Sequence, residues 1–393
     1  METVDFNPKN ITHMVFNLTN QCNLRCKYCF TEHNPRKMSL DTLKQAILFG
    51  INTCGVKRGT FFGGEPMLEY ETLIKPIVKW VEEEKIPITF GMTTNGTHFT
   101  DERLQWLKDH KIGFLLSIDG DKDTQDYNRP QINGKGSFDL VNPYIDKIIE
   151  LFPNTTFRST VTPYSGRNVV KDYLYARKKG FRYYYLIPDC LNFKWTEEDL
   201  SIFFKNYANI LEIMYRDITV GILPLEISQF IKSLQKVFPY YYDKNFPQQQ
   251  ATIYRCGLGT TSIGVSPEGY LSGCQEHCTY KEDSSPFYIG DIYNGFDKER
   301  QEKLWSYILN KPTITNENHN CKECPSRKMC SAQFCPSHNW LNNQDLTISD
   351  DISCKWQVFQ NGMSMILLDK AARENNGLFL EWLLDRLKTN NYS

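Results

Sequence analysis

The sequence lacks an excess of charge of either sign. Its 393 residues include 45 Lys and Arg against 46 Asp and Glu, which gives a formal net charge of -1. A chain without a basic surplus has no overall electrostatic attraction for nucleic acid or for an anionic membrane. We therefore expect no nucleic-acid or membrane partner, and binding has to be argued from local sites.

Long apolar runs are also missing. No stretch approaches the ~18 to 20 apolar residues that a membrane-spanning helix needs, and the mean hydropathy is -0.48. The first residues, Met-Glu-Thr-Val-Asp, lack the basic stretch and apolar segment of a secretory signal. These features predict a cytoplasmic protein in a reducing compartment, where structural disulfides are uncommon.

Cysteine, in contrast, is plentiful and unevenly distributed. The 13 cysteines are an odd number, with eight of them between Cys256 and Cys354. Three more lie close together near the start, while Cys54 and Cys190 stand alone. A disulfide scaffold would not leave the middle of the chain nearly empty, so this pattern favours metal binding or catalysis.

Short β-rich runs alternate with helical periodicity over residues 1–190. Strands are predicted at 14–19, 59–62, 88–94, 113–118, 156–162 and 183–187, and helices at 39–53, 71–84, 101–110, 143–151 and 168–179. Parallel strands need crossover connections of this length. The pattern predicts an α/β fold, a partial (β/α)6 TIM-type barrel, because six units fall short of the eight that close a full barrel.

The rest of the chain divides into three further predicted parts. Residues 191–252 form a helical connection, with one helix starting at Thr196 and a second over 226–237. Residues 253–360 form a cysteine-rich domain with a β-hairpin (261–266 and 270–272 around Pro267-Glu268-Gly269) followed by loops and helices. Residues 361–393 carry a C-terminal helix, from about 377 to 387.

The first cysteine group has the spacing CxxxCxxC and follows the first predicted strand directly. It consists of Cys22, Cys26 and Cys29. Thiolates suit zinc or iron-sulfur clusters. A structural zinc site normally takes four protein ligands. A four-iron cluster held by three cysteines instead leaves one iron open for an exchangeable ligand, which can be a substrate or cofactor.

This triplet, with the aromatic Tyr28 before its last cysteine, resembles the signature of the radical S-adenosylmethionine (SAM) enzymes. The resemblance implies that SAM binds the open iron and that its one-electron reduction generates a 5'-deoxyadenosyl radical, which abstracts hydrogen. A zinc knuckle or chance spacing is the alternative.

Motifs further along the chain match the same family and imply SAM contacts. Gly63, Gly64, Glu65 and Pro66 resemble the glycine-rich motif that meets the SAM amino group, and glycine permits close approach of backbone to a ligand. Polar residues end the third and fourth strands, where α/β sheets build ligand sites. These are Thr94, Asn95, Ser117 and Asp119. The Asn-Gly and Asp-Gly pairs among them are equally typical of turns.

The resemblance implies three further cofactor-binding residues. Ser117 and Arg129 would hold the SAM carboxylate, for which an Arg fork is suited. The family has a His-Asp pair before this Arg, and this sequence departs from it with Gln125-Asp126. Arg158 would point into the open face of the sheet, and Ile187 would lie beside the adenine.

The C-terminal cysteines resemble the SPASM extension that carries auxiliary four-iron clusters in peptide-modifying radical SAM enzymes. One spacing departs, because four residues separate Cys330 from Cys335 where three are usual. The resemblance implies three [4Fe-4S] clusters in all. Cys256, Cys274 and Cys335, with Cys278 as fourth ligand, would bind the nearer auxiliary cluster, and Cys321, Cys324, Cys330 and Cys354 the farther one. Zinc is the alternative here, since paired cysteines also occur in zinc ribbons.

Several reactions remain open within the resemblance. The favoured hypothesis is a maturase that abstracts hydrogen from a ribosomally made peptide and forms a thioether or carbon-carbon crosslink. Alternatives are formylglycine formation of the anaerobic sulfatase-maturase type, peptide epimerisation, haem or small-cofactor biosynthesis, and a non-catalytic metal-binding scaffold. A low-potential flavodoxin or ferredoxin is implied as electron donor.

The sulfatase maturases that this arrangement resembles place an Asp directly after the hairpin cysteine, as a base. Here Gln275 follows Cys274, and a neutral amide cannot accept that proton. Asp189 and Glu276 are the candidates for this base.

The two isolated cysteines have different expected roles. Cys190 is a candidate hydrogen donor, with a structural role as the alternative. Cys54 is predicted to be a small buried hydrophobic residue.

Overall fold

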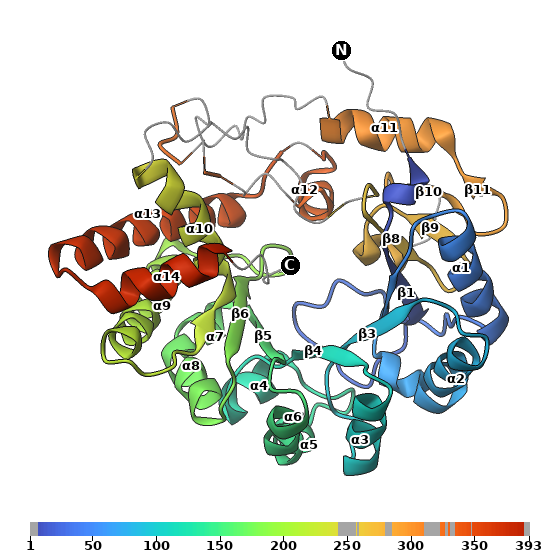
Figure 1. The fold of residues 1–393 in the computed structure, drawn as a ribbon, viewed down its shortest axis with the longest axis horizontal. Helices are drawn as coiled ribbons and strands as arrows, with labels where there is room; N and C mark the ends of the chain where they lie inside the picture. The colour runs from blue at the N-terminus through green and yellow to red at the C-terminus, as the bar shows by residue number, and fades with distance from the viewer. Residues whose placement is uncertain are drawn as a thin grey trace. The chain divides into compact units, whose positions relative to one another are not determined.

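The computed structural model describes residues 7–242, 257, 259–279, 285–309, 323–326, 329–330, 335–346 and 348–388 (Figure 1). Two compact units divide the chain, and neither is continuous in sequence. Unit 1 comprises Met1–Ser117, Gln131–Phe152 and Tyr254–Thr313, and unit 2 comprises Ile118–Pro130, Pro153–Ile253 and Ile314–Ser393.

Four parallel strands form the centre of unit 1. They are β1 (His13–Thr19), β2 (Arg58–Gly63), β3 (Thr89–Thr94) and β4 (Gly113–Ser117), paired in chain order. The connections contain α1 (Leu40–Asn52), α2 (Lys75–Glu83) and α3 (Asp101–Asp109). Side chains of Ser39 and Thr100 cap α1 and α3 by accepting hydrogen bonds from backbone N–H groups, which explains where these helices begin.

The C-terminal hairpin continues this sheet on the other side of β1. Strand β8 (Ser262–Val265) pairs with β1 in parallel, and β9 (Tyr270–Ser272), β10 (Tyr288–Asp291) and β11 (Gly295–Phe296) follow in antiparallel order. The hairpin was predicted, but its pairing with β1, nearly 250 positions earlier in the chain, has no local signal. Helix α11 (Lys298–Leu309) comes after β11.

Shorter elements in unit 1 refine two predicted helices. The stretch predicted at 71–84 begins as a π-turn (Tyr70–Ile74), preceded by a 3-10 turn (Pro66–Glu69), before α2. The stretch predicted at 143–151 consists of a 3-10 turn (Asn142–Tyr144) and α6 (Ile145–Leu151), after α5 (Phe138–Val141). Further 3-10 turns cover Pro8–Asn10 and Gln275–Thr279.

Unit 2 contains a second set of parallel strands and most of the long helices. Strands β5 (Thr156–Val161), β6 (Tyr183–Pro188) and β7 (Glu226–Ile227) pair in chain order. The helices are α4 (Lys122–Asn128), α7 (Pro163–Gly166), α8 (Val169–Lys178), α9 (Glu197–Thr219), α10 (Ser228–Tyr242), α12 (Pro336–Asn343), α13 (Asp351–Arg373) and α14 (Gly377–Lys388). The predicted mixed α/β class with a core of parallel strands is confirmed.

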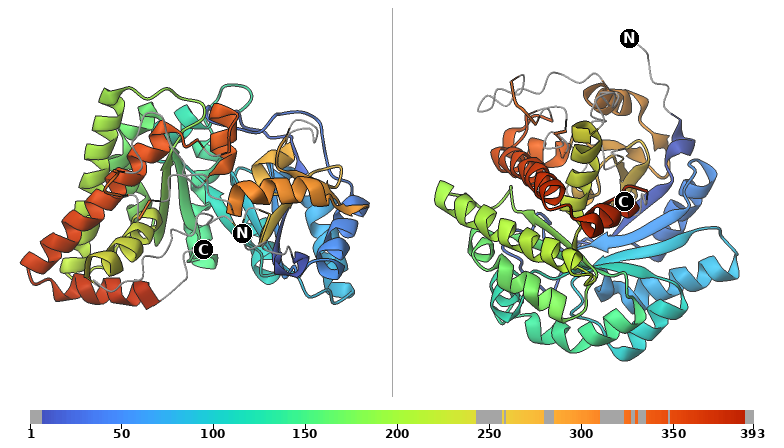
Figure 2. Two further views of the ribbon diagram at one scale, coloured as in Figure 1. Left: turned by 90° about the horizontal axis from the view of Figure 1, so that it is seen from above. Right: turned by 60° about the vertical axis from the view of Figure 1, so that its left-hand side comes forward.

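Helix α13 runs across the predicted boundary between residues 360 and 361, and it packs against α10 and α9 (Figure 2). Its buried face is partly polar, which removes the apolar period that marks a helix in sequence. Gln360 Nε2 donates to the hydroxyl of Tyr207 at 3.1 Å, and Ser364 Oγ donates to Ser233 Oγ at 2.9 Å. These bonds satisfy groups that would otherwise be costly to bury. None of the described helices is long and apolar enough to cross a membrane.

Candidate cluster and cofactor site

The loop that follows β1 holds the three N-terminal cysteines. Cys22, Cys26 and Cys29 are all half-buried, and Tyr28 beside them is buried. The backbone N–H of Leu24 donates to Cys22 Sγ at 3.4 Å, and Asn95 Nδ2 lies 3.7 Å from the same sulfur. Donors directed at a sulfur favour its thiolate, the form that binds iron.

The local electrostatics of Cys22 bear on whether a metal group fits this loop. Burial raises the pKa of the Cys22 thiol to about 12, and the nearby Glu65 carboxylate raises it further. A thiolate in this position therefore needs a compensating positive charge. Three half-buried thiols in one loop and sulfur-directed N–H groups together fit an iron-sulfur cluster, whose irons supply that charge.

Glycines bring the β2 loop against the cysteine loop. A Cβ atom on Gly63 would lie 2.3 Å from the carbonyl oxygen of Thr19, and one on Gly64 would lie 2.2 Å from that of Gln21. Gly63 also has a φ of +139°, which other residues rarely adopt. The pair therefore lets the end of β2 lie directly against the end of β1 and the start of the cysteine loop.

Glu65 connects this contact to the end of β3. Its side chain is 1% exposed and accepts three hydrogen bonds. Oε1 accepts from the N–H of Met67 at 2.9 Å and the hydroxyl of Thr94 at 2.7 Å, and Oε2 accepts from the N–H of Asn95 at 2.7 Å. Pro66 is buried at the start of the turn. The structure therefore brings together the glycine-rich motif, the β3 end and the cysteine loop, all in unit 1. Ser117 is buried at the end of β4 in the same unit.

The remaining predicted SAM contacts lie in unit 2, around the ends of β5 and β6. Asp119 is buried, and its Oδ1 accepts from the N–H of Thr160 at 3.1 Å and lies 3.8 Å from Arg129 Nη1. Arg158 Nη1 donates to Thr160 Oγ1 at 2.6 Å. Ile187 stands opposite Thr160 in the β5–β6 register. These four predicted residues thus share one neighbourhood in this unit.

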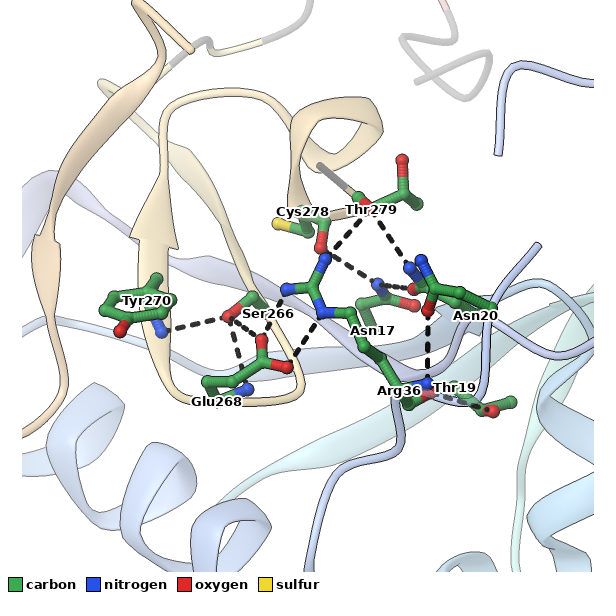
Figure 3. Close-up of polar contacts among 10 residues, drawn as sticks. Asn17, Thr19, Asn20, Arg36, Ser266, Glu268, Tyr270, Cys278 and Thr279 are labelled. Carbon is green, nitrogen blue, oxygen red and sulfur yellow. Dashed lines mark hydrogen bonds and ion pairs between the residues drawn. The ribbon is translucent and has the colours of Figure 1, made fainter. Parts of the chain in front are cut away.

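A polar network in unit 1 joins the segments on either side of the N-terminal cysteines to the cysteine-bearing turn after β9 (Figure 3). Asn17 Nδ2 donates to the carbonyl of Cys278 at 3.1 Å, and Asn20 Nδ2 donates to the carbonyl of Thr279 at 3.0 Å. Arg36 Nη1 also donates to the Thr279 carbonyl at 3.0 Å. Sequence reasoning missed these residues, although two Asn in and beside an apolar strand are a usable signal of buried polar contacts.

The same Arg36 pairs with Glu268 in the hairpin turn. Its Nε donates to Glu268 Oε1 at 2.8 Å, and Nη2 contacts Oε2. Ser266 and Tyr270 complete the turn, because the Ser266 hydroxyl donates to Glu268 and accepts from the N–H of Tyr270. The predicted turn Pro267-Glu268-Gly269 therefore also anchors the cysteine loop of unit 1.

The C-terminal cysteines differ in how they are placed. No disulfide joins any of the eleven cysteines in the described part of the chain. Cys256 and Cys321 lie outside the described residues. Cys278 is 2% exposed, and burial raises its pKa to about 12. The other described members of the predicted auxiliary sets are half-buried, namely Cys274, Cys324, Cys330, Cys335 and Cys354.

The three candidate catalytic residues have different surroundings. Asp189 Oδ2 accepts the N–H groups of Asn192 and Phe193 at 2.8 and 2.9 Å, so this carboxylate shapes a turn, and burial raises its pKa. Glu276 is half-buried in the 3-10 turn after β9. The Cys190 thiol lies 2.9 Å from His338 Nδ1. Burial raises the pKa of this thiol, and the imidazole lowers it.

These features define an α/β protein with a loop of three cysteines at the carboxyl end of a parallel strand. The Radical SAM superfamily model matches residues 16–174, from β1 into α8. A cysteine-type anaerobic sulfatase-maturating enzyme of Clostridium novyi (strain NT) is 25% identical over 349 residues, which are 82% of this chain and 87% of that protein. The match identifies residues 16–174 as a radical SAM domain, and the similarity to the sulfatase-maturating enzyme extends over most of the chain.

Solved structures share the fold. Native anSMEcpe with bound AdoMet and Cp18Cys peptide matches with a TM-score of 0.70 and 20% identity, covering 92% of this chain and 99% of that one. Streptococcus suis SuiB bound to precursor peptide SuiA matches with a TM-score of 0.53 and 15% identity, covering 88% of this chain and 76% of that one.

Proposed function

We propose that this radical SAM enzyme is a maturase that modifies a ribosomally made peptide by forming a thioether or carbon-carbon crosslink. The observation that carries the proposal is the linkage within unit 1 of the N-terminal cysteine loop to the Cys278 turn through Asn17, Asn20 and Arg36. It holds a cysteine-bearing turn at a fixed place beside the radical SAM loop, as an enzyme with auxiliary clusters requires.

We assign roles to the chain's own residues as follows. Cys22, Cys26 and Cys29 hold the SAM-binding [4Fe-4S] cluster, which with SAM supplies one-electron chemistry and hydrogen abstraction. Glu65 fixes the backbone of the glycine-rich motif and of the β3 end through its three bonds. The remaining predicted SAM contacts are Tyr28, Gly63, Gly64, Pro66, Thr94, Asn95, Ser117, Asp119, Arg129, Arg158 and Ile187.

The auxiliary clusters are assigned in the same way. Cys256, Cys274, Cys278 and Cys335 hold one, and Cys321, Cys324, Cys330 and Cys354 hold the other. Crosslinking removes two hydrogen atoms from the peptide, so electrons have to leave the substrate after abstraction. A cluster held by one of these cysteine sets would offer them a path, and a low-potential flavodoxin or ferredoxin would supply the reducing electron. We place this reaction in the cytoplasm, where reduced thiols persist.

Formylglycine formation is the second candidate, supported by the similarity to sulfatase-maturating enzymes over most of the chain. It needs a base near the reacting carbon, and the neutral Gln275 stands where the resemblance predicts a carboxylate. Glu276 is the neighbouring carboxylate in the same turn.

Mass spectrometry distinguishes the two candidates. The chain is co-expressed under anaerobic conditions with a small peptide encoded beside its gene and, separately, with a sulfatase-derived peptide. A crosslinked product loses two hydrogens and resists fragmentation between the joined residues. Conversion of a Cys thiol to an aldehyde in the sulfatase peptide, with no change in the neighbouring peptide, would reverse the order of the candidates. The Cys22→Ala variant is the control for cluster-dependent chemistry.

A further inference from the structure

Three side chains with metal-binding atoms meet in unit 2, and none of the three is assigned to SAM or to a cluster. They are Cys190, His338 and Asp350. Cys190 Sγ lies 2.9 Å from His338 Nδ1. One ligand atom from each of the three residues lies within 4.8 Å of the other two. A thiol, an imidazole and a carboxylate are thus brought to a single point.

The three residues come from separate segments of the chain. Cys190 follows β6 by two residues, His338 lies in the first turn of α12, and Asp350 is the N-cap of α13. Sequence spacing gives no hint of this meeting, because 148 positions separate Cys190 from His338. Only the folding of unit 2 brings them together.

Further hydrogen bonds fix these segments. Asn342, one turn after His338 in α12, donates from Nδ2 to the carbonyl oxygen of Cys190 at 2.9 Å. Asp350 is 8% exposed, and its Oδ1 accepts the N–H of Ser353 at 2.7 Å. Partners of this kind orient metal ligands before an ion binds. The carboxylate can bridge the N–H and an ion, since each of its oxygens has two lone pairs.

The spacing fits one ion better than a cluster. Around a tetrahedral zinc ion, with Zn–S at ~2.3 Å and Zn–N at ~2.0 Å, sulfur and nitrogen ligands stand about 3.5 Å apart. The present 2.9 Å contact needs to open by well under ~1 Å to reach that distance. Ligands of a four-iron cluster bind different irons and stand farther apart than these three atoms do.

We propose that Cys190, His338 and Asp350 form a binding site for one divalent transition-metal ion, with Zn²⁺ as its preferred occupant. Three protein ligands of mixed sulfur, nitrogen and oxygen type leave a fourth position for water or another ligand. The ion ties the segment after β6 to α12 and α13. Those helices begin beside Cys335 and Cys354.

Metal analysis of the full-length, cluster-loaded protein tests the site without any assay of catalysis. We expect about one zinc per chain in addition to iron. Replacement by Co²⁺ should give a near-ultraviolet band from thiolate-to-cobalt charge transfer, which reports a cysteine ligand. Cys190→Ser and His338→Ala should abolish this band and the zinc while the iron content stays at the wild-type level. Cys54→Ser, which changes a buried cysteine of unit 1, is the matched control and should retain both.

Asp350→Asn separates metal binding from helix capping. Asn caps helices as well as Asp does, so α13 keeps its N-cap while the ion loses a charged ligand. We expect Co²⁺ affinity to fall by more than about tenfold, with unchanged helix content. The proposal is overturned if the loaded wild-type protein binds no equimolar zinc or cobalt, since the three side chains are then only a hydrogen-bonded group. It is equally overturned if Cys190→Ser loses iron, which would make Cys190 a cluster ligand.

Discussion

Replacing Glu65 by Gln tests whether this carboxylate organises the radical SAM loop. Its two oxygens accept the N–H groups of Met67 and Asn95 and the hydroxyl of Thr94. A Gln amide keeps one accepting oxygen, so its NH2 group has to face at least one of the two backbone N–H groups. Leaving one buried donor without an acceptor costs about 2 to 3 kcal/mol when the lost acceptor is charged.

Hydrogen exchange followed by mass spectrometry measures this cost where it arises. A loss of 2 to 3 kcal/mol in local opening free energy speeds exchange by about 30- to 150-fold. We expect this acceleration in peptides that cover residues 94–97, with weaker SAM binding and unchanged iron. Glu69→Gln is the matched control, because Glu69 is buried in the same 3-10 turn but contacts Lys37 and Thr72. Unchanged exchange at 94–97 in the Glu65 variant, or equal acceleration in the control, would refute this reasoning.

Three further predictions follow from the site and its supports. Cys22→Ala should remove about one third of the iron, while Cys54→Ala removes none; equal losses by iron analysis would contradict the assignment of the first cluster. A double-mutant cycle of Arg36→Met and Glu268→Gln should return a coupling energy of about 1 kcal/mol in chemical denaturation, since the pair is partly exposed; additive effects would mean that the pair does not anchor the hairpin. Burial raises the pKa of Asp172 well above its usual value, so its stabilising contribution is complete below the ordinary Asp pKa and declines as the pH rises through the folded-state pKa. The thermal midpoint of Asp172→Asn should therefore gain on that of wild type as the pH is raised above about 4, and a pH-independent difference would rule this out.

The parallel strands of the fold were predictable because each carries its own apolar run and is followed by a helix with a recognisable start. β1 to β6 lie within one or two residues of their predicted bounds. Helix α13 was not predictable from periodicity, since Gln360 and Ser364 occupy its buried face and bond to other helices. The pairing of β8 with β1 was equally hidden, because strand order between distant segments is decided by tertiary packing.

The site shows the same division between local and distant information. Spacing located the N-terminal cysteines and the polar strand ends, because these residues act within a few positions of each other. Arg36 and Asn20 were missed, since their partners in the hairpin and in the turn after it are more than 230 positions away. Burial distinguishes two cysteines that spacing alone treats alike. Cys278 is buried, and its sulfur lies only 2.4 Å from the place that a Cβ on Gly264 would take, whereas Cys274 is half-buried.

The glycine-rich motif changes meaning once its contacts are known. Besides the ligand role that the sequence predicts, Gly63 and Gly64 approach the carbonyls of Thr19 and Gln21, at the end of β1 and the start of the cysteine loop. Glu65 then connects that contact to the end of β3. The motif therefore positions the cysteine loop before any cofactor arrives. A loop ordered in advance loses less conformational freedom when a cluster and SAM bind, so a Cβ at Gly64 should weaken both together.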